Sequence, residues 1–194
     1  MQTPQRHISL LLDRSGSMNS IRDDIIGSVN RFWNDQKMTG VPTTATMMLF
    51  DSQNPFDCML ENRPIEEVPE LNLHYYQPRG GTPLLDAIGS AINSLSRHIL
   101  TVSKESRPNG IIFVVVTDGQ ENSSIEFSHA DIKNLILEKE AAGWQVEFLS
   151  SDLDAIAEFR MLTPRESKSV RINYSNANAL HLGLDMISRN IKFR

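Results

Sequence analysis

The sequence predicts an α/β fold, a three-layer sandwich in which a mostly parallel sheet lies between helices. Strand-like and helix-like segments alternate from end to end, which is the pattern of a parallel sheet joined by crossover helices. The most continuous apolar run, GIIFVVVTD at 110–118, is typical of a central strand covered on both faces. The alternating segment at 56–62 follows a turn-like SQNP and predicts an antiparallel edge strand.

The first half of the chain gives two strands, one helix and the edge strand. HISLLLD at 7–13 is short and apolar, and TTATMMLFD at 43–51 is rich in β-branched and apolar residues, so both predict strands. Between them, 20–37 has apolar residues at helical spacing, namely Ile21, Ile25, Val29, Phe32 and Trp33. The segment 63–81 has three prolines and a glycine pair and predicts irregular structure.

The second half continues the alternation. Apolar residues on one face predict a helix over 82–100, and a Ser-x-x-Asp capping pattern opens a helix at 128–143. We further expect a strand at 144–150, a short helix at 152–162, a last strand at 167–173 and a closing helix marked by Leu180, Leu184, Ile187 and Ile191. No linker or repeat interrupts the pattern, so we expect one domain over 1–194.

Composition limits the classes of function that the sequence is compatible with. A net charge of −5 and a pI of about 5.5 weigh against a nucleic-acid or anionic-membrane binder. No stretch approaches the ~20 apolar residues of a membrane helix, and the N-terminus does not resemble a secretory signal, so we expect a soluble cytoplasmic protein. The single cysteine, Cys58, excludes an intrachain disulfide and is interpreted as a packed or partly exposed thiol.

Two predicted strands end in aspartate. Asp13 closes the first strand and is followed by Ser15 and Ser17 in DRSGSM, while Asp118 closes the strand at 110–118. Ligands of open α/β sheets bind beyond the carboxyl ends of strands, so these side chains converge if the two strands are neighbours. A third loop, PRGGTPLLD, brings Thr82 to a helix start.

Two carboxylates and three hydroxyls form an all-oxygen donor set. Such a set suits a hard divalent cation, Mg²⁺ first, with Mn²⁺ or Ca²⁺ as alternatives. A helix cap is the competing interpretation of Asp13, Ser15 or Ser17, and Thr82 is a candidate N-cap in either case. Asp118 alone could be a turn residue, but the three loops together favour metal ligation.

The three loops resemble the metal-ion-dependent adhesion site of von Willebrand factor type A (VWA) domains. Asp13, Ser15 and Ser17 match the D-x-S-x-S motif, and Thr82 and Asp118 match the threonine and aspartate of the second and third loops. The resemblance implies a Rossmann-like sheet of about six strands with one antiparallel edge. It also implies a binding module without enzymatic activity, often an adaptor or a companion of an ATPase, whose ion takes an Asp or Glu from a protein partner.

Two other classes of function stay open. One is a Mg²⁺-dependent phosphoryl-transfer or hydrolytic enzyme that uses Asp13, although no second acid, Walker lysine or placed histidine accompanies it. The other is a scaffold with a vestigial metal site. The oligomeric state is not fixed by the sequence.

In VWA domains the threonine loop and the last helix can shift together, which would couple Thr82 to 177–192.

Several neighbouring polar residues receive weaker interpretations. Arg14 either assists an approaching carboxylate or faces solvent. Asp51 is interpreted as a strand-end turn residue, Asp152 and Asp154 as an N-cap and a first-turn acid, and Glu121 and Asn122 as solvated loop residues rather than part of the rim.

Overall fold

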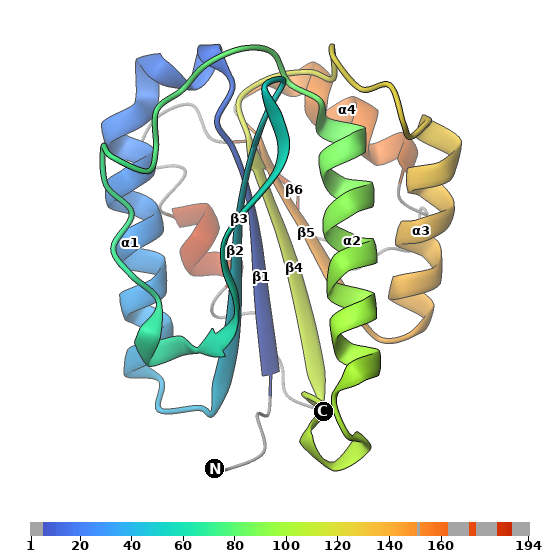
Figure 1. Ribbon diagram of the computed structural model, residues 1–194. Helices are drawn as coiled ribbons and strands as arrows, with labels where there is room; N and C mark the ends of the chain where they lie inside the picture. Colours follow the sequence, from blue (N-terminus) through green and yellow to red (C-terminus); the bar gives the residue numbers. More distant parts are fainter. Residues whose placement is uncertain (1–5, 151, 163–170, 174–181, 188–194) are drawn as a thin grey trace.

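A six-stranded sheet forms the centre of the molecule (Figure 1). The computed structural model describes residues 6–150, 152–162, 171–173 and 182–187. The strand order is β3-β2-β1-β4-β5-β6, and only the β2–β3 pair is antiparallel. The strands are β1 (Arg6–Asp13), β2 (Thr43–Asp51), β3 (Asn54–Pro64), β4 (Gly110–Thr117), β5 (Gln145–Ser150) and β6 (Arg171–Asn173). The predicted fold class and the antiparallel edge are confirmed, and β3 is longer than the expected 56–62.

Helices cover both faces of the sheet. α1 (Arg22–Met38) and a short helix at 182–187 lie on one face (Figure 1), whereas α2 (Leu84–Thr101), α3 (His129–Ala141) and α4 (Leu153–Leu162) lie on the other. Short 3₁₀ turns occupy Gly16–Ile21, Ile65–Glu67 and Lys104–Ser106. Of the expected last strand and closing helix, 167–170, Leu180 and Ile191 lie outside the described residues.

The strands separate two apolar layers because successive side chains point to opposite faces. In β4, Val114 and Val116 pack in the α1-side cluster, whereas Phe113 and Val115 pack in the α2-side cluster. This double coverage explains the continuous apolar run. Phe32 and Trp33 of α1 are each 2% exposed and form a ring pair in the core. Among the described residues, no helix is long and apolar enough to cross a membrane.

The strand order places the candidate residues. β1 pairs with β2 on one side and with β4 on the other, in parallel, with Leu12 opposite Val116. The carboxyl ends of β1 and β4 therefore meet at one edge of the sheet, where the order of connection reverses. Asp13 and Asp118 are adjacent for this reason.

Candidate metal centre

Hydroxyl and carboxylate oxygens gather where β1 and β4 end. The Ser17 hydroxyl donates to Asp118 Oδ1 at 2.7 Å, across 101 residues of sequence. The hydroxyl oxygens of Ser15 and Ser17 lie 3.1 Å apart. Ser15 is buried, whereas Ser17 is exposed and Asp118 is half-buried. The cluster therefore has a closed inner side and an outer side that reaches solvent.

Asp13 forms the floor of this cluster. Its side chain is closed to solvent, and its two oxygens accept hydrogen bonds from Ser15 N and Thr117 Oγ1, each at 2.6 Å. Burial raises the pKa of Asp13 to about 7; the hydrogen bonds from Thr117 and Ser15 oppose the rise, and the charge of Asp118 adds to it. No arginine or lysine forms an ion pair with Asp13 within the described part of the chain.

Asp118 has a similar electrostatic environment. Burial raises the pKa of its carboxyl, the Ser17 hydrogen bond lowers it, and the charge of Asp152 raises it further. Two neighbouring carboxylates whose ionised forms are both disfavoured create a demand for positive charge.

Thr82 belongs to the same cluster. A Cβ built on Gly119 would stand 3.7 Å from both Ser17 Oγ and Thr82 Oγ1, so both hydroxyls border that glycine. The prediction that Thr82 is the helix N-cap is wrong: the N-cap position of α2 is Pro83, with no side-chain capping bond. All five predicted side chains therefore lie at the same edge of the sheet, and their metal ligation stays a prediction.

The donor set fits a hard cation. The side chains offer oxygen only, and each carboxylate oxygen keeps a second lone pair beside its hydrogen bond. Across the described residues, no three His, Cys, Asp or Glu side chains gather in a way that could hold a metal, so the serine and threonine hydroxyls are essential to this candidate. Few protein ligands with water completing the shell is the coordination Mg²⁺ accepts.

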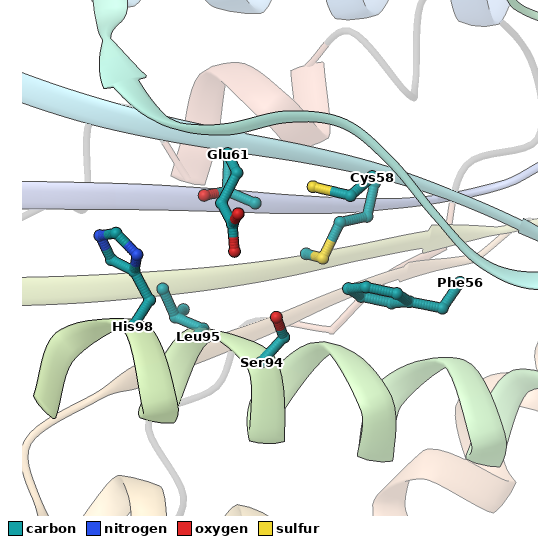
Figure 2. A pocket seen from close by; sticks show the side chains of 8 residues that line it. Phe56, Cys58, Glu61, Ser94, Leu95 and His98 are labelled. Carbon is teal, nitrogen blue, oxygen red and sulfur yellow. The ribbon is translucent and has the colours of Figure 1, made fainter. Parts of the chain in front are cut away.

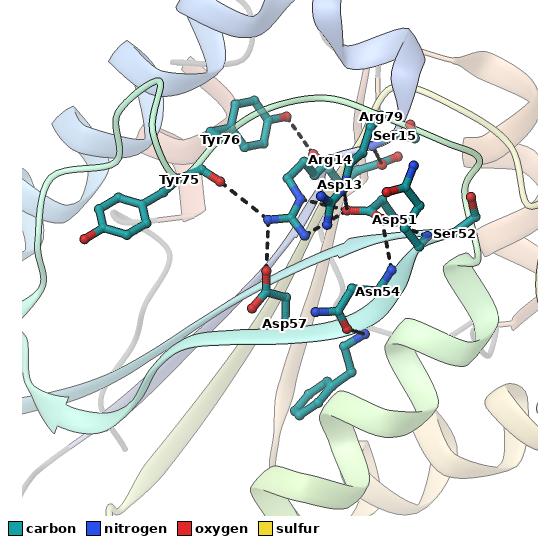
Figure 3. Close-up of polar contacts among 12 residues, drawn as sticks. Asp13, Arg14, Ser15, Asp51, Ser52, Asn54, Asp57, Tyr75, Tyr76 and Arg79 are labelled. Carbon is teal, nitrogen blue, oxygen red and sulfur yellow. Dashed lines mark hydrogen bonds and ion pairs between the residues drawn. The ribbon is translucent and has the colours of Figure 1, made fainter.

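Arg14 neither faces solvent nor awaits a ligand, which corrects both interpretations of it. The residue is 6% exposed, and its Nε and Nη2 each lie 2.8 Å from Asp51 Oδ2 (Figure 3). Its Nη1 pairs with Asp57 at 2.9 Å and lies 3.5 Å from the Tyr75 carbonyl. The guanidinium is therefore held below the surface by ion pairs with two carboxylates, although its Nη2 makes no hydrogen bond.

Asp51 is more than a turn residue. Its Oδ1 accepts the backbone N–H groups of Gln53 and Asn54, as a strand-end turn requires. Its Oδ2 also accepts from Arg14 and from Arg79 Nε at 3.1 Å, and the side chain is closed to solvent. Burial alone would raise the pKa of Asp51, but the hydrogen bonds from Arg14, Asn54 and Gln53, with the Arg14 charge, hold it below its usual value.

These arginines fasten two of the site loops together. Arg79 N donates to the Arg14 carbonyl at 2.8 Å, and Gly16 N donates to the Gly80 carbonyl at 3.0 Å. Gly80 has a φ of +67°, and a Cβ there would collide with the Ser52 hydroxyl, so this close approach requires glycine. The Tyr76 hydroxyl adds a 2.6 Å bond to the Asp13 carbonyl. The serine loop is thereby held against the segment that leads to Thr82.

Glu121 and Asn122 hold the threonine loop through hydrogen bonds; Asn122 is exposed, as predicted for a solvated loop residue, and Glu121 is half-buried. Asn122 Oδ1 accepts Thr82 N at 2.8 Å, and Glu121 Oε2 accepts Leu85 N at 2.9 Å at the start of α2. In return, the buried Asp86 carboxylate accepts the N–H groups of 125–127 at 2.8–2.9 Å. The Thr82 and Asp118 loops are thus interlocked through carboxylates and backbone.

The remaining candidates have other roles. Asp152 Oδ1 accepts Asp154 N at 2.6 Å as α4 begins, which supports the helix-cap interpretation, and its Oδ2 accepts from Gln120. Cys58 borders a cavity of about 10 Å³ between β3 and α2 (Figure 2), room for about one water molecule. Cys58 is exposed, but partial burial of its thiol raises the pKa, with the charge of Glu61 adding to the effect, so the reactive thiolate is disfavoured.

Sequence reasoning missed four residues that position the site: Thr117, Tyr76, Arg79 and Asp86. Thr117 could have been found, since it ends β4 directly before Asp118. Asp86 carried the weak signal of an acid in the first turn of α2. Arg79 and Tyr76 lie in a segment without periodicity, and nothing in their local pattern indicates a contact with β1.

Comparison with known proteins identifies the fold. No protein-family model matches the chain, and no curated protein matches it in sequence. Solved structures do match: a von Willebrand factor type A protein from Catenulispora acidiphila (TM-score 0.58, 11% identity) and proximal thread matrix protein 1 from the mussel byssus (TM-score 0.63, 12% identity). Each match covers 95% of this chain but only 42% and 46% of those chains, so this chain spans less than half their length.

A third structure matches over nearly its whole length. The SpRpn10 VWA domain has a TM-score of 0.59 and 13% identity, with 96% of both chains covered. The architecture is therefore that of the Rossmann-like α/β class. More specifically, the chain has the fold of a VWA domain.

Proposed function

We propose that this protein is a metal-dependent protein-binding module that holds a divalent cation, Mg²⁺ first, through Asp13, Ser15, Ser17, Thr82 and Asp118. The observation that carries the proposal is the 2.7 Å contact between Ser17 and Asp118 beside the buried Asp13. The two carboxylates have raised pKa values, and a divalent ion would balance their charge. VWA domains are generally interaction modules, which agrees with this role.

The ion would attract an acidic partner. The three hydroxyl ligands are neutral, so the ion retains part of its charge and favours one more anionic oxygen. Ser17 and Asp118 are the solvent-reaching members of the cluster, so the free coordination position faces outward. A carboxylate from an Asp or Glu of a protein partner can replace a water there.

An enzymatic role for Asp13 is disfavoured. A phosphoryl-accepting aspartate must reach the substrate phosphorus, but Asp13 is closed to solvent and both its oxygens accept short hydrogen bonds. Asp13-dependent hydrolysis of generic phosphoesters in Mg²⁺ would overturn the binding-module proposal.

Thermal unfolding with and without divalent ions tests the metal step. An ion that binds only the folded state adds about 2.7 kcal/mol at a hundredfold excess over its Kd. We expect Mg²⁺ and Mn²⁺ to raise the Tm of the wild type and of Asp24→Ala, an exposed-acid control, but not of Asp13→Ala. A vestigial site would show no shift in any variant.

Binding of an acidic probe tests the partner step. Bound Mn²⁺ speeds the relaxation of water protons, and a carboxylate that displaces its water reduces this effect. We expect a short peptide with one aspartate to reduce the relaxation enhancement by the wild-type Mn²⁺ complex. In Thr82→Ala the peptide should reduce it less, while the circular dichroism spectrum stays unchanged. Peptide binding that persists equally in EDTA would show that the interaction uses another face.

A further inference from the structure

Arg79 differs from the other charged groups of the site in having one end fixed and one end free. Its Nε donates to Asp51 Oδ2 at 3.1 Å, and its side chain is 44% exposed. Among the described residues, its two terminal amino groups have no acceptor. Arg14, by comparison, is 6% exposed and directs all three guanidinium nitrogens to protein oxygens.

The anchor of Arg79 is rigid. Asp51 is closed to solvent and is itself held by Arg14 and by the backbone of Gln53 and Asn54. The Arg79 backbone is tied to the Arg14 carbonyl at 2.8 Å. A guanidinium fixed at Nε loses little conformational entropy when its outer edge binds a carboxylate with two parallel hydrogen bonds.

The position of Arg79 relative to the metal centre sets the spacing of any ligand that touches both. Asp51 ends β2 and Asp118 follows β4, with β1 between them. Neighbouring strands lie ~4.8 Å apart, so the ends of β2 and β4 are separated by roughly 10 Å. The proposed ion, between Asp13 and Asp118, would lie more than one strand spacing from the Asp51 anchor of Arg79. One carboxylate cannot span that distance, whereas two acidic side chains of one segment can.

We propose that Arg79 is a second anchor for the partner, and that the partner presents two acidic side chains on one face of a segment. One carboxylate binds the ion and the other binds the free edge of Arg79. This inference rests on the proposed function of the metal centre and specifies its ligand. In an extended segment, residues i and i+2 share a face about 6.6 Å apart, and their side chains supply the remaining reach.

Charge balance supports an acidic second contact. Arg14 and Arg79 are balanced by Asp51 and Asp57, and a divalent ion balances Asp13 and Asp118. Asp152 adds negative charge beside Asp118, but it follows β5, on the far side of β4 from the Asp51 anchor. A second carboxylate at Arg79 therefore gains charge-assisted hydrogen bonds on the side of the site away from Asp152. A metal–carboxylate bond alone cannot discriminate between acidic partners, and a second anchor provides selectivity.

The test compares two glycine–serine peptides with uncharged termini, one with a single aspartate and one with aspartates at i and i+2. Affinities are measured by NMR titration in saturating Mg²⁺. For the wild type we expect the two-acid peptide to bind roughly three- to tenfold more tightly, beyond the about twofold statistical advantage of two equivalent acids. In Arg79→Gln the ratio should fall to the statistical value, and Arg79→Lys should restore part of it.

Arg22→Gln is the matched control, since it removes an equal charge from an arginine whose ion pair is with Asp23. Because each variant yields a ratio, a change in metal affinity does not distort the result. An advantage that survives Arg79→Gln, or that Arg22→Gln removes equally, overturns the proposal. Tighter binding of a dinucleotide of equal charge also overturns it. A one-acid peptide that fails to bind, or that binds in EDTA, refutes the metal-centre function itself.

Discussion

Asp13 and Asp51 end neighbouring parallel strands, and both side chains are closed to solvent, but their surroundings differ. Asp51 contacts two arginines and two backbone N–H groups, and its pKa lies below the usual value despite burial. Asp13 contacts one hydroxyl and one N–H, and burial raises its pKa to about 7. The protein supplies the countercharge of Asp51, whereas Asp13 has no cationic partner within the described part of the chain.

At this one edge of the sheet, Asp51 has a structural role, whereas Asp13 belongs to the candidate functional site. Asp51 with Arg14, Arg79 and Asp57 is electrostatically complete, so it contributes rigidity to the serine loop. Asp13 with Ser15, Ser17, Thr82 and Asp118 is electrostatically incomplete, which is the condition expected of a ligand-free metal centre.

The largest expected effect on stability comes from removing the Asp51 carboxylate. Asp51→Ala leaves two arginines without their buried partner, and we expect it to lower the free energy of unfolding by about 3–5 kcal/mol. Urea denaturation measures this change. Asp57→Ala is the control, since that carboxylate is 37% exposed and its loss should cost within about 1 kcal/mol. Equal effects of the two variants would contradict the central place of Asp51.

A smaller effect on stability comes from Asp13, and it depends on pH. In the metal-free protein, folded Asp13 keeps its proton up to about pH 7, whereas the unfolded chain loses it near pH 4. The folded state therefore binds more protons in this window, and stability falls as pH rises from about 4 to 7, by at most about 1.4 kcal/mol per pH unit.

Asp13→Asn removes this contribution because its amide does not titrate. Urea denaturation at several pH values in EDTA should show a shallower fall in stability for Asp13→Asn than for the wild type. Saturating Mg²⁺ should have the same flattening effect on the wild type, since the ion keeps the carboxylate ionised. Parallel curves for the two proteins in EDTA would contradict the electrostatic difference between Asp13 and Asp51.

The smallest expected effect on stability comes from Glu121, which contacts the start of α2 beside Thr82. Glu121→Ala removes the acceptor for Leu85 N at the start of α2, and loss of such a cap costs about 0.5–2 kcal/mol. Glu126→Ala, an exposed acid of the same loop, is the control and should be near neutral. The difference between the two free energies of unfolding measures how much the carboxylate at the α2 N-terminus contributes. If the two variants have the same free energy of unfolding, the contact between the Thr82 and Asp118 loops depends on the bonds from Asp86 to the backbone instead.

Much of this architecture could be predicted from the sequence because it follows from periodicity. The apolar run of β4, the alternation in β3 and the amphipathic pattern of α2 each report on local burial. The five candidate ligands could be proposed because strand ends converge at a predictable edge and because the three loops resemble the VWA motif; their ligation stays a prediction. The cap at α2 was placed wrongly, on Thr82, because the acid that accepts the Leu85 N–H group lies 36 residues beyond Leu85 in the chain.

The network around Asp51 could not be predicted for the same physical reason. Arg14 and Asp51 are 37 residues apart, and Arg79 lies in an irregular loop. Whether a charged side chain faces solvent or a buried partner depends on tertiary contacts that no local pattern encodes. Arg14 and Arg79 appear equally exposed from the sequence, yet only Arg79 has a solvent-facing edge.

Diffraction from crystals grown with Mn²⁺ tests the central claim that an ion supplies the missing countercharge of Asp13. We predict an anomalous peak beside Asp13, within coordination distance of the Ser15 and Ser17 hydroxyls, and no corresponding peak at Asp51. Asp13→Ala crystals grown in the same solution should lack the peak. Its absence from wild-type crystals at millimolar Mn²⁺ would contradict the account, because Asp13 would then tolerate burial without any cation.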